Sequence, residues 1–479
     1  MNRSRRTAAL LVSISFGWLL LFAHNGIRAP FSGDDLMNLH GYLSQPASAL
    51  LLDNLRFWST SYRPLGGLFY VSLWDAFGFN PLPFRLACFA LLALNLGLLW
   101  RFTLRLSGSR EIAFLALLLA GYHAWFVDLY YSTGTVYDLL CYAFFLGAFN
   151  FYLGIRGRGA GLSWRQTGIL TALYICALNA KEMAVTLPLL LAAYEAVYQA
   201  RAVRDGRLAW LVREGRGVLI CGLATALYVA GKLTGPGSLA EVPAYHISIS
   251  PVRYLHTFFI YLNPLLYQDH VFRSPNTSQL LLAMLAAALL LRSRPLLFAW
   301  CFVIFSLLPV AFIAHYAGFF LYLPMAGWAL YAAVMLSKAR AFLLALLIRA
   351  AKPGETWAAR MRMASIAALP PLLALFLAPH HWSESARTLR LFESVQPPTR
   401  ELSTELLALR PSLPKGARVL YLDDPLPKDG YTLLFLTRLL YHDMSIAVER
   451  APQSPTPRGG FDAIFIFRDG RLAEWPGPG

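Results

Sequence analysis

The sequence predicts an α-helical polytopic membrane protein with about eleven transmembrane helices and a small soluble α/β domain at its C-terminal end. Hydrophobic residues occupy 57% of the 479 positions and charged residues only 14%, a ratio that one soluble core with a charged shell cannot accommodate. Apolar stretches near the length of a membrane-spanning helix recur through residues 1–379, whereas residues 380–479 alternate helical and strand patterns.

The apolar runs are separated by short loops, and each run is an expected span. These spans are Ala8 to His24, Pro83 to Phe102, Ile112 to Val127, Thr135 to Ile155, Gln166 to Ala180, Met183 to Gln199, Gly217 to Ala230, Gln279 to Leu291, Pro295 to Ala314, Gly318 to Ser337 and Met363 to Leu377. An odd number of spans places the two chain ends on opposite sides of the membrane.

The formal charge of +16 belongs to the membrane part of the chain. From His380 to the end there are twelve positive and twelve negative side chains, so the tail is neutral. Basic residues gather instead in alternate loops between the expected spans, which is the positive-inside pattern. This distribution argues against a nucleic-acid partner and predicts a cytoplasmic N-terminus with an extracytoplasmic domain at residues 380–479.

Three regions of the membrane part fit neither a span nor a basic loop. One of them, Ala341 to Arg349, is too short to cross and is expected to extend the tenth span or to lie along the inner surface. Residues 28–82 form a large external loop with amphipathic runs, Ala49 to Trp58 and Leu65 to Phe77, that suit helices on the membrane surface. Val252 to Leu266 carries polar residues within an apolar run and is expected to be an interfacial or re-entrant helix.

The tail shows a sequence of short elements with turn residues between them. A helix is expected over Thr399 to Leu409, a strand over Arg418 to Leu422 and a helix over Tyr431 to Tyr441. Strands at Ser445 to Val448 and Ala463 to Phe467 complete the pattern of a small α/β domain.

The strongest local signal in the external loop is the acidic pair Asp34-Asp35, one or two turns beyond the first span. An Asp before an apolar-periodic stretch is a common helix N-cap, so the simpler interpretation is that Asp34 caps the following helix, and one of the pair could serve only that purpose. A second acid at the outer mouth of a membrane bundle could act as a general base or bind a divalent ion. Metal dependence is open, since two adjacent carboxylates can hold Mg²⁺ or Mn²⁺.

Basic residues on the outer side run against the orientation rule and call for a reason. Arg63, in Tyr62-Arg63-Pro64, and Lys181, beside Glu182 in a tight outer turn, are candidates to bind an anionic ligand such as a phosphate. The simpler interpretation of Lys181 is an ion pair with Glu182. Arg85, at the start of the second span, is expected to extend toward lipid headgroups.

Further acids and aromatic residues are assigned to the same outer mouth. Asp128 and Asp138 flank the loop between the third and fourth spans, and His315 and Tyr316 could reach it from a later loop. The acids expected on the outer side are Asp34, Asp35, Asp53, Asp75, Asp128, Asp138, Glu182, Glu241 and Asp269. Together with the outer cations they suit a reaction centre at that surface.

The layout and several short motifs resemble the GT-C superfamily of polyprenyl-phosphate-dependent glycosyltransferases, which includes protein O-mannosyltransferases and aminoarabinose transferases. The resemblance rests on the early acidic pair, on Arg63-Pro64 before the second span, and on the segments Lys181 to Pro188 and Leu321 to Pro324. It covers about residues 1–340. The chain lacks the tetratricopeptide repeats of one related branch and has the short α/β tail instead.

The resemblance implies an inverting transfer of a sugar from a polyprenyl-phosphate donor, in a bacterial-type inner membrane, to a lipid, glycan or protein acceptor in the cell envelope. It implies that Asp34 or Asp35 is the base and that Arg63 and Lys181 bind the donor phosphate. His315 and Tyr316 are a further extension of that set, with Tyr62, Arg85, Asp128, Asp138 and Glu182 in support. The alternatives are a transporter or flippase for a lipid-linked sugar and a non-catalytic membrane scaffold.

Overall fold

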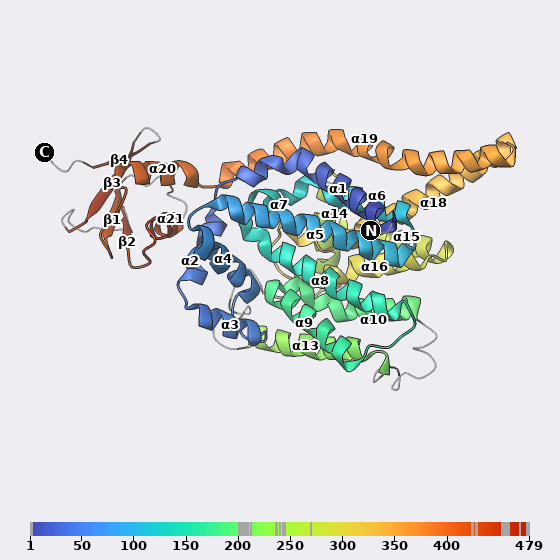
Figure 1. The fold of residues 1–479 in the computed structure, drawn as a ribbon, viewed down its shortest axis with the longest axis horizontal. Coiled ribbons are helices and arrows are strands. Elements are labelled where there is room, and N and C mark those ends of the chain that lie inside the picture. Colours follow the sequence, from blue (N-terminus) through green and yellow to red (C-terminus); the bar gives the residue numbers. More distant parts are fainter. Residues whose placement is uncertain are drawn as a thin grey trace.

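The structure is a computed structural model that describes residues 3–199, 210, 213–234, 238, 241, 246–268, 271–422, 426, 430–451, 460–468 and 471–475. Figure 1 shows a bundle of long helices with a small sheet beyond one end of it. The bundle helices are α1 Arg3–Ala23, α5 Pro81–Ser107, α6 Arg110–Gly121, α7 Val127–Tyr131, α8 Val136–Arg156, α9 Trp164–Ala180, α10 Leu187–Tyr198, α13 Arg216–Leu233, α14 Pro251–Leu265, α15 Ser274–Leu290, α16 Arg294–Ser306, α17 Leu308–Ala311, α18 Met325–Ala351 and α19 Glu355–Val395.

Six helices in the described part of the chain are long and apolar enough to cross a membrane. They are built on α1, α5, α8, α13, α18 and α19. A bent pair, Arg110–Gly121 and Ala124–Tyr131, would make a seventh span, and α15 and α16 are shorter apolar helices. These helices support an integral membrane protein, but the expected total of eleven spans is not confirmed.

The departures from the expected spans have physical causes. The third expected span is broken, because Tyr122 and His123 adopt extended backbone angles and the helix resumes at a 55° bend. Among the described helices, α10 has 12 residues, and at 1.5 Å per residue it covers roughly 18 Å, well short of the ~30 Å hydrocarbon core. A 3₁₀ turn at Glu182–Thr186 takes up the residues before it.

The external loop folds into three helices, α2 Gly33–Leu43, α3 Ala47–Leu55 and α4 Pro64–Phe77. The two expected surface helices correspond to α3 and α4. The first helix starts at a capping box, in which Ser32 and Asp35 exchange hydrogen bonds. Pro64 at the first position of α4 fixes its start, since proline has no amide hydrogen to lose there. These helices lie at the end of the bundle nearest the sheet (Figure 1).

The tail forms α20 Thr399–Leu409, β1 Arg418–Leu422, α21 Thr432–Leu440, β2 Ala447–Arg450, β3 Ala463–Arg468 and β4 Arg471–Glu474. The four strands make one sheet in the order β2-β1-β3-β4, with β1 parallel to both neighbours and β4 antiparallel to β3. Every expected tail element is present, within two residues at each end, and β4 was not expected. The expected boundary at residue 380 falls inside α19, which continues unbroken to Val395.

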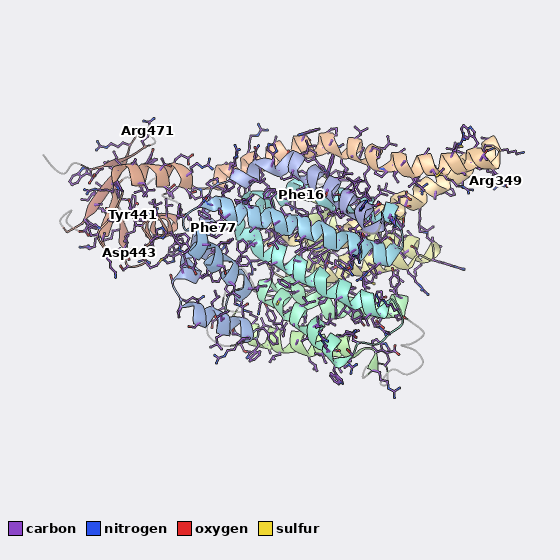
Figure 2. All side chains as sticks on the ribbon, in the orientation of Figure 1. Phe16, Phe77, Arg349, Tyr441, Asp443 and Arg471 are labelled. Carbon is purple, nitrogen blue, oxygen red and sulfur yellow. The ribbon has the colours of Figure 1, made fainter. Side chains whose placement is uncertain are left out.

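The tail packs directly on the external loop, and Figure 2 draws the side chains of both parts. The Thr399 hydroxyl donates a hydrogen bond to the Phe31 carbonyl, and Arg438 of α21 donates to His40 of α2 at 3.1 Å. The ring of His40 also contacts Phe435 at 4.6 Å between centroids. The tail therefore contacts the same helix that carries the acidic pair.

Candidate functional site

The N-terminal end of α8 is the point where the external loop, the α9–α10 turn and the broken α6–α7 segment meet. Lys181, in the turn after α9, donates to both carboxylate oxygens of Asp138, at 2.6 and 2.7 Å. Both side chains are buried, with exposed fractions of 2% and 6%. The ammonium group also lies over the rings of Phe319 and Phe320, at 4.4 and 4.8 Å from their centroids. The expected pairing of Lys181 with Glu182 is wrong.

Glu182 instead pairs with Arg63 from the external loop. The Arg63 Nε and Nη2 atoms donate to Glu182 Oε2 at 3.2 and 2.9 Å. The guanidinium lies over the rings of Tyr62 and Tyr137, at 4.6 and 5.1 Å. Arg63 has a φ of 42°, a conformation that non-glycine residues adopt only where surrounding contacts hold them. The ion pair and the two rings supply those contacts.

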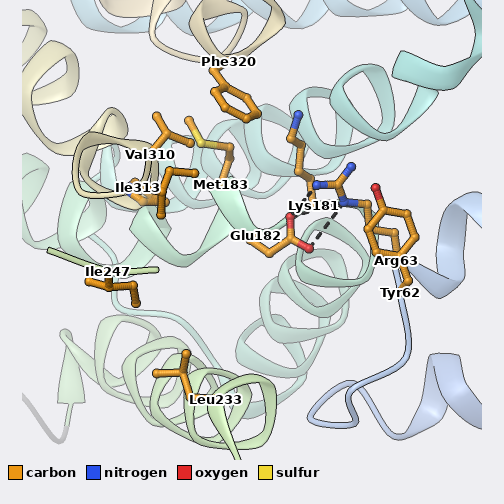
Figure 3. Close-up of a pocket in the computed structure, with 11 residues that line it drawn as sticks. Tyr62, Arg63, Lys181, Glu182, Met183, Leu233, Ile247, Val310, Ile313 and Phe320 are labelled. Atoms are coloured by element: carbon orange, nitrogen blue, oxygen red, sulfur yellow. Dashed lines mark hydrogen bonds and ion pairs between the residues drawn. The ribbon is translucent and has the colours of Figure 1, made fainter. Parts of the chain in front are cut away.

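Arg63, Lys181 and Glu182 line one side of a pocket of about 620 Å³, a volume that includes its opening to solvent. Figure 3 shows Arg63 joined to Glu182, with Lys181 beside them and apolar side chains across the space. The remaining wall consists of Tyr62, Met183, Leu233, Ile247, Pro309, Val310, Ile313 and Phe320. The rim holds the two cations Arg63 and Lys181 and the opposite wall is apolar, a combination that suits a ligand with an anionic head and a hydrocarbon part.

The acidic pair divides into two different environments. Asp35 is fully buried, and its carboxylate accepts hydrogen bonds from the Ser32 amide at 2.8 Å and from the Ser132 hydroxyl at 3.3 Å. Asp34 is exposed, and no hydrogen bond or ion pair of its side chain is found among the described residues. The carboxyl of Asp35 is thus committed to the helix cap, and that of Asp34 is accessible.

Asp34 lies beside Gly134, where an added Cβ would come within 3.0 Å of the Asp34 Cβ. Gly134 lies in the 3₁₀ turn Thr133–Thr135 directly before α8, and Asp138 stands in the first turn of α8. The accessible carboxylate therefore lies beside the turn that leads into the helix end where the Lys181–Asp138 pair is held.

The environment shifts the acid–base behaviour of the loop residues. Burial is the main cause that raises the pKa of Asp35 to about 6, against the opposing hydrogen bond from Ser32 and the charge of Arg85. The surrounding protein raises the pKa of Asp34 by desolvation, although the side chain keeps an exposed face. Both shifts raise the pKa of a loop carboxyl above its ordinary value, the direction that favours a group able to take up a proton.

Burial and the partner's charge and hydrogen bonds act in opposite directions on the pKa of Lys181 and on that of Glu182, and burial has the larger net effect only for Lys181. Burial lowers the pKa of Lys181, and the Asp138 charge only partly offsets it. Burial alone would raise the pKa of Glu182, but the charge and hydrogen bonds of Arg63 hold that pKa below its usual value. Glu182 therefore stays ionised as the partner of Arg63.

Arg85 does not extend toward headgroups, so that expectation is wrong. Its side chain is fully buried, and its guanidinium donates to the carbonyls of Gly26, at 2.9 Å, and Tyr130. It also contacts the hydroxyl of Thr133 at 3.4 Å. Arg85 thus ties the end of α1 to the segment that precedes α8, and its role is to position that segment.

Three other expected site residues, Asp128, His315 and Tyr316, do not line the pocket. Asp128 is half-buried and close enough to Asp34 for their charges to repel. His315 is exposed and contacts Phe320, while Tyr316 contacts Tyr261, outside the pocket lining. Of the nine acids assigned to the outer side, Asp269 lies outside the described residues.

Whether the acidic side chains form a metal site depends on how many of them lie together. Within the described ranges, no group of three or more His, Cys, Asp and Glu side chains could hold a metal ion. The oxygens of Asp35 are directed to Ser32 and Ser132, which leaves the Asp34 carboxylate as the accessible oxygen ligand of the pair.

Several residues of the site were not identified from the sequence. Phe320 covers Lys181, Gly134 makes room for Asp34, and Lys232 of α13 donates to the Ser61 carbonyl next to the pocket. The close approach at Gly134 could have been suspected only from the glycine within Ser132-Thr133-Gly134-Thr135.

No protein-family model matches this chain, and no curated protein sequence matches it either.

Proposed function

We propose that this chain is a membrane glycosyltransferase that moves a sugar from a polyprenyl-phosphate donor to an acceptor on the extracytoplasmic side. The observation that carries the proposal is the placement of the accessible Asp34 beside Gly134, in the turn that leads into the helix end where the buried Lys181–Asp138 pair lies. One end of the bundle then holds a base, cations and an apolar pocket together. The external loop and the tail lie at this same end of the bundle (Figure 1), which is consistent with our proposal that this end faces the extracytoplasmic side.

The reaction would be a single displacement with inversion. The acceptor hydroxyl gives its proton to the Asp34 carboxylate, and its oxygen forms the new bond to the anomeric carbon. The bond from that carbon to the phosphate oxygen breaks, and the polyprenyl phosphate leaves with the additional negative charge. Arg63 and Lys181 would stabilise this charge, because cations near a departing phosphate lower the transition-state energy.

The cations are already paired with Glu182 and Asp138 in the structure. A donor phosphate would add to a cluster whose pairs are neutral, with Lys232 nearby as an additional cation. The carboxylates hold the cations in place before the donor binds, since an unpaired cation at a membrane boundary is costly. Arg63, with five N–H donors, can bind a phosphate while keeping one hydrogen bond to Glu182.

The test is transfer by the purified full chain in lipid nanodiscs. Wild type is incubated with a panel of radiolabelled polyprenyl-phosphate sugars and a membrane extract as acceptor source, in parallel with Asp34→Asn. We expect transfer by wild type and a loss of about 10²-fold or more in Asp34→Asn, as for removal of a general base. An Asp34→Asn variant that folds and transfers at the wild-type rate would refute the assignment of the base.

The broken helix favours a second candidate, a flippase for a lipid-linked sugar. Transporters often use discontinuous membrane helices at their binding sites, and α6 and α7 are separated by a 55° bend at Tyr122 and His123. The discriminating measurement is movement of a fluorescent polyprenyl phosphate across proteoliposomes. Movement without sugar transfer would favour the flippase, whereas the enzyme requires transfer that depends on Asp34.

A further inference from the structure

A second hollow adjoins the cationic pocket, and Tyr62 lines both. We call this second hollow the loop groove; it has a volume of about 1050 Å³, including its open side. Its polar lining is Asn38, Gln45, Asp53 and Ser61, with the rings of Tyr42 and Tyr62. All of these residues come from the external loop, so the groove is built by α2, α3 and the segment before α4.

The floor of the loop groove is a continuation of the helix face that carries Asp34. Met37, Asn38 and Gly41 lie three, four and seven residues after Asp34 on α2, the spacing that places side chains on one face of a helix. Met37, with 47% of its side chain exposed, and Asn38 begin about one turn beyond the Asp34 carboxylate. A molecule lying in the groove can therefore extend one end to Asp34.

The chemistry of the loop groove differs from that of the cationic pocket. Its lining holds one ionisable carboxylate, Asp53, and no Lys, Arg or His among the described residues. Amide and carboxylate groups offer both donors and acceptors for hydroxyl groups, and the tyrosine rings offer flat apolar surfaces. An anionic ligand would meet Asp53, and Lys232, the cation whose charge reaches Asp53, lies outside the lining and already donates to the Ser61 carbonyl. The groove therefore suits a neutral, hydroxyl-rich ligand.

We propose that the loop groove binds a neutral glycan acceptor, with the reacting hydroxyl at Asp34 and the following sugar units between α2 and α3. The inference rests on the proposed glycosyl transfer and adds the class of its acceptor. The donor would enter from the apolar side of the cationic pocket, the acceptor would enter along α2, and the two would meet near Tyr62 and Asp34.

Gly41 allows the groove to be filled without disturbing the protein. No atom lies within 4 Å of a Cβ built at Gly41, and its backbone is helical, so Gly41→Phe places a ring in the groove at little cost to the fold. Gly168 on α9 is a matched control, because it is also an exposed helical glycine with no atom within 4 Å of an added Cβ.

The first measurement is equilibrium binding of neutral di- to tetrasaccharides to the full chain in nanodiscs, with uronic-acid oligosaccharides as the anionic comparison. We expect neutral sugars to bind wild type and Gly168→Phe, and binding to Gly41→Phe to weaken by about tenfold or more. Failure of wild type to bind neutral sugars, or preference for the uronic acids, would overturn the proposal. Equal binding by Gly41→Phe would do so as well.

The second measurement separates this proposal from the proposed enzyme activity. In the transfer assay, Gly41→Phe should raise the acceptor KM by about tenfold while the affinity for the polyprenyl-phosphate donor stays at the wild-type value. A parallel loss of donor affinity would contradict an acceptor groove. Neutral sugars that bind wild type and lose affinity in Gly41→Phe, without any transfer, would keep the groove and reject the transferase.

Discussion

Lys181 contacts both carboxylate oxygens of Asp138, and the residue next to it, Glu182, pairs with Arg63. The two crossed ion pairs join the α9–α10 turn to α8 on one side and to the external loop on the other. The Lys181–Asp138 pair is the more buried, with exposed fractions of 2% and 6% against 11% and 25%. Removal of one member of such a pair leaves a charge buried without a partner.

Lys181→Met should therefore destabilise the protein by about 3–5 kcal/mol, because Asp138 loses its partner. The double variant Lys181→Met with Asp138→Asn should recover much of that loss, since no buried charge remains. Binding of undecaprenyl phosphate should be weakened in both variants if Lys181 holds the phosphate. Thermal unfolding in detergent and lipid-binding titrations measure the two effects separately.

A matched control for this experiment lies at the other end of α8. Arg156 and Glu195 form a pair at 2.7 Å in which both side chains are 1% exposed, about 30 Å along the helix from its start. The double variant Arg156→Met with Glu195→Gln should leave the affinity for undecaprenyl phosphate unchanged. An equal loss of affinity in this control would mean that Lys181 acts only through stability.

Asp34→Asn and Asp35→Asn should differ in their effect on the rate of sugar transfer. Asp34→Asn removes the accessible carboxylate, and we expect transfer to fall by at least about 10²-fold with unchanged thermal stability. Asp35→Asn keeps an amide oxygen that can accept the Ser32 amide hydrogen, so transfer should remain within about tenfold of wild type. The comparison uses initial rates at saturating donor. A full loss in Asp35→Asn alone would reverse the assignment.

The sequence predicted local structure more accurately than it predicted partners. Strand β1 and helix α20 begin and end at the residues predicted from their patterns, because alternation and helical periodicity are local signals. The break at Tyr122 and His123 has no proline or glycine pair at its centre. It depends on long-range contacts such as the hydrogen bond between His123 and the Leu265 carbonyl at 2.9 Å.

The same distinction applies to the candidate site. An acidic pair near a helix start is visible in the sequence, but the cap is the box formed by Ser32 and Asp35, so the simpler assignment of the cap to Asp34 is wrong. The hydrogen bond from Ser132 to Asp35 joins residues nearly a hundred positions apart and is not visible in the local pattern. Likewise, adjacency of Lys181 and Glu182 suggested a local pair, whereas tertiary packing gave each a distant partner. Ion-pair partners are set by the folded arrangement and cannot be read from neighbouring positions.

The capping carboxylate of Asp35 should make stability depend on pH. Its pKa is about 6 in the folded protein against an ordinary value of 3.8, so between these values the folded state binds more protons than the unfolded state. Stability should therefore decrease as pH rises from about 4 to about 6, by about 3 kcal/mol in total. Thermal unfolding between pH 4 and 7.5 measures this decrease.

Asp35→Asn should reduce this dependence, since the amide does not titrate, while Asp34, whose pKa is also raised, keeps a part of it. Asp75→Asn is the control, because Asp75 is exposed on the neighbouring helix α4 and should leave the wild-type slope unchanged. An Asp35→Asn slope equal to that of wild type would assign the titration to another group.

The contact between the tail and the external loop should weaken in acid. Arg438 donates to the Nε2 atom of His40, which requires that nitrogen to be unprotonated. Burial, and then the charge of Arg438, lower the pKa of His40 from its ordinary value of 6.5. The released state therefore binds more protons than the docked state as the pH falls below 6.5, and the docked state loses stability.

Hydrogen exchange of α2 and α21, corrected for intrinsic rates, tests this prediction. Exchange of both helices should increase between pH 7.5 and 5.5 in wild type, and His40→Gln should show little dependence on pH because glutamine can accept the Arg438 hydrogen bond in both conditions. Because α2 carries Asp34, a loosened contact should also lower transfer at pH 5.5 in wild type more than in His40→Gln. If protection of α2 and α21 stays constant in wild type, His40 does not control the docking of the tail.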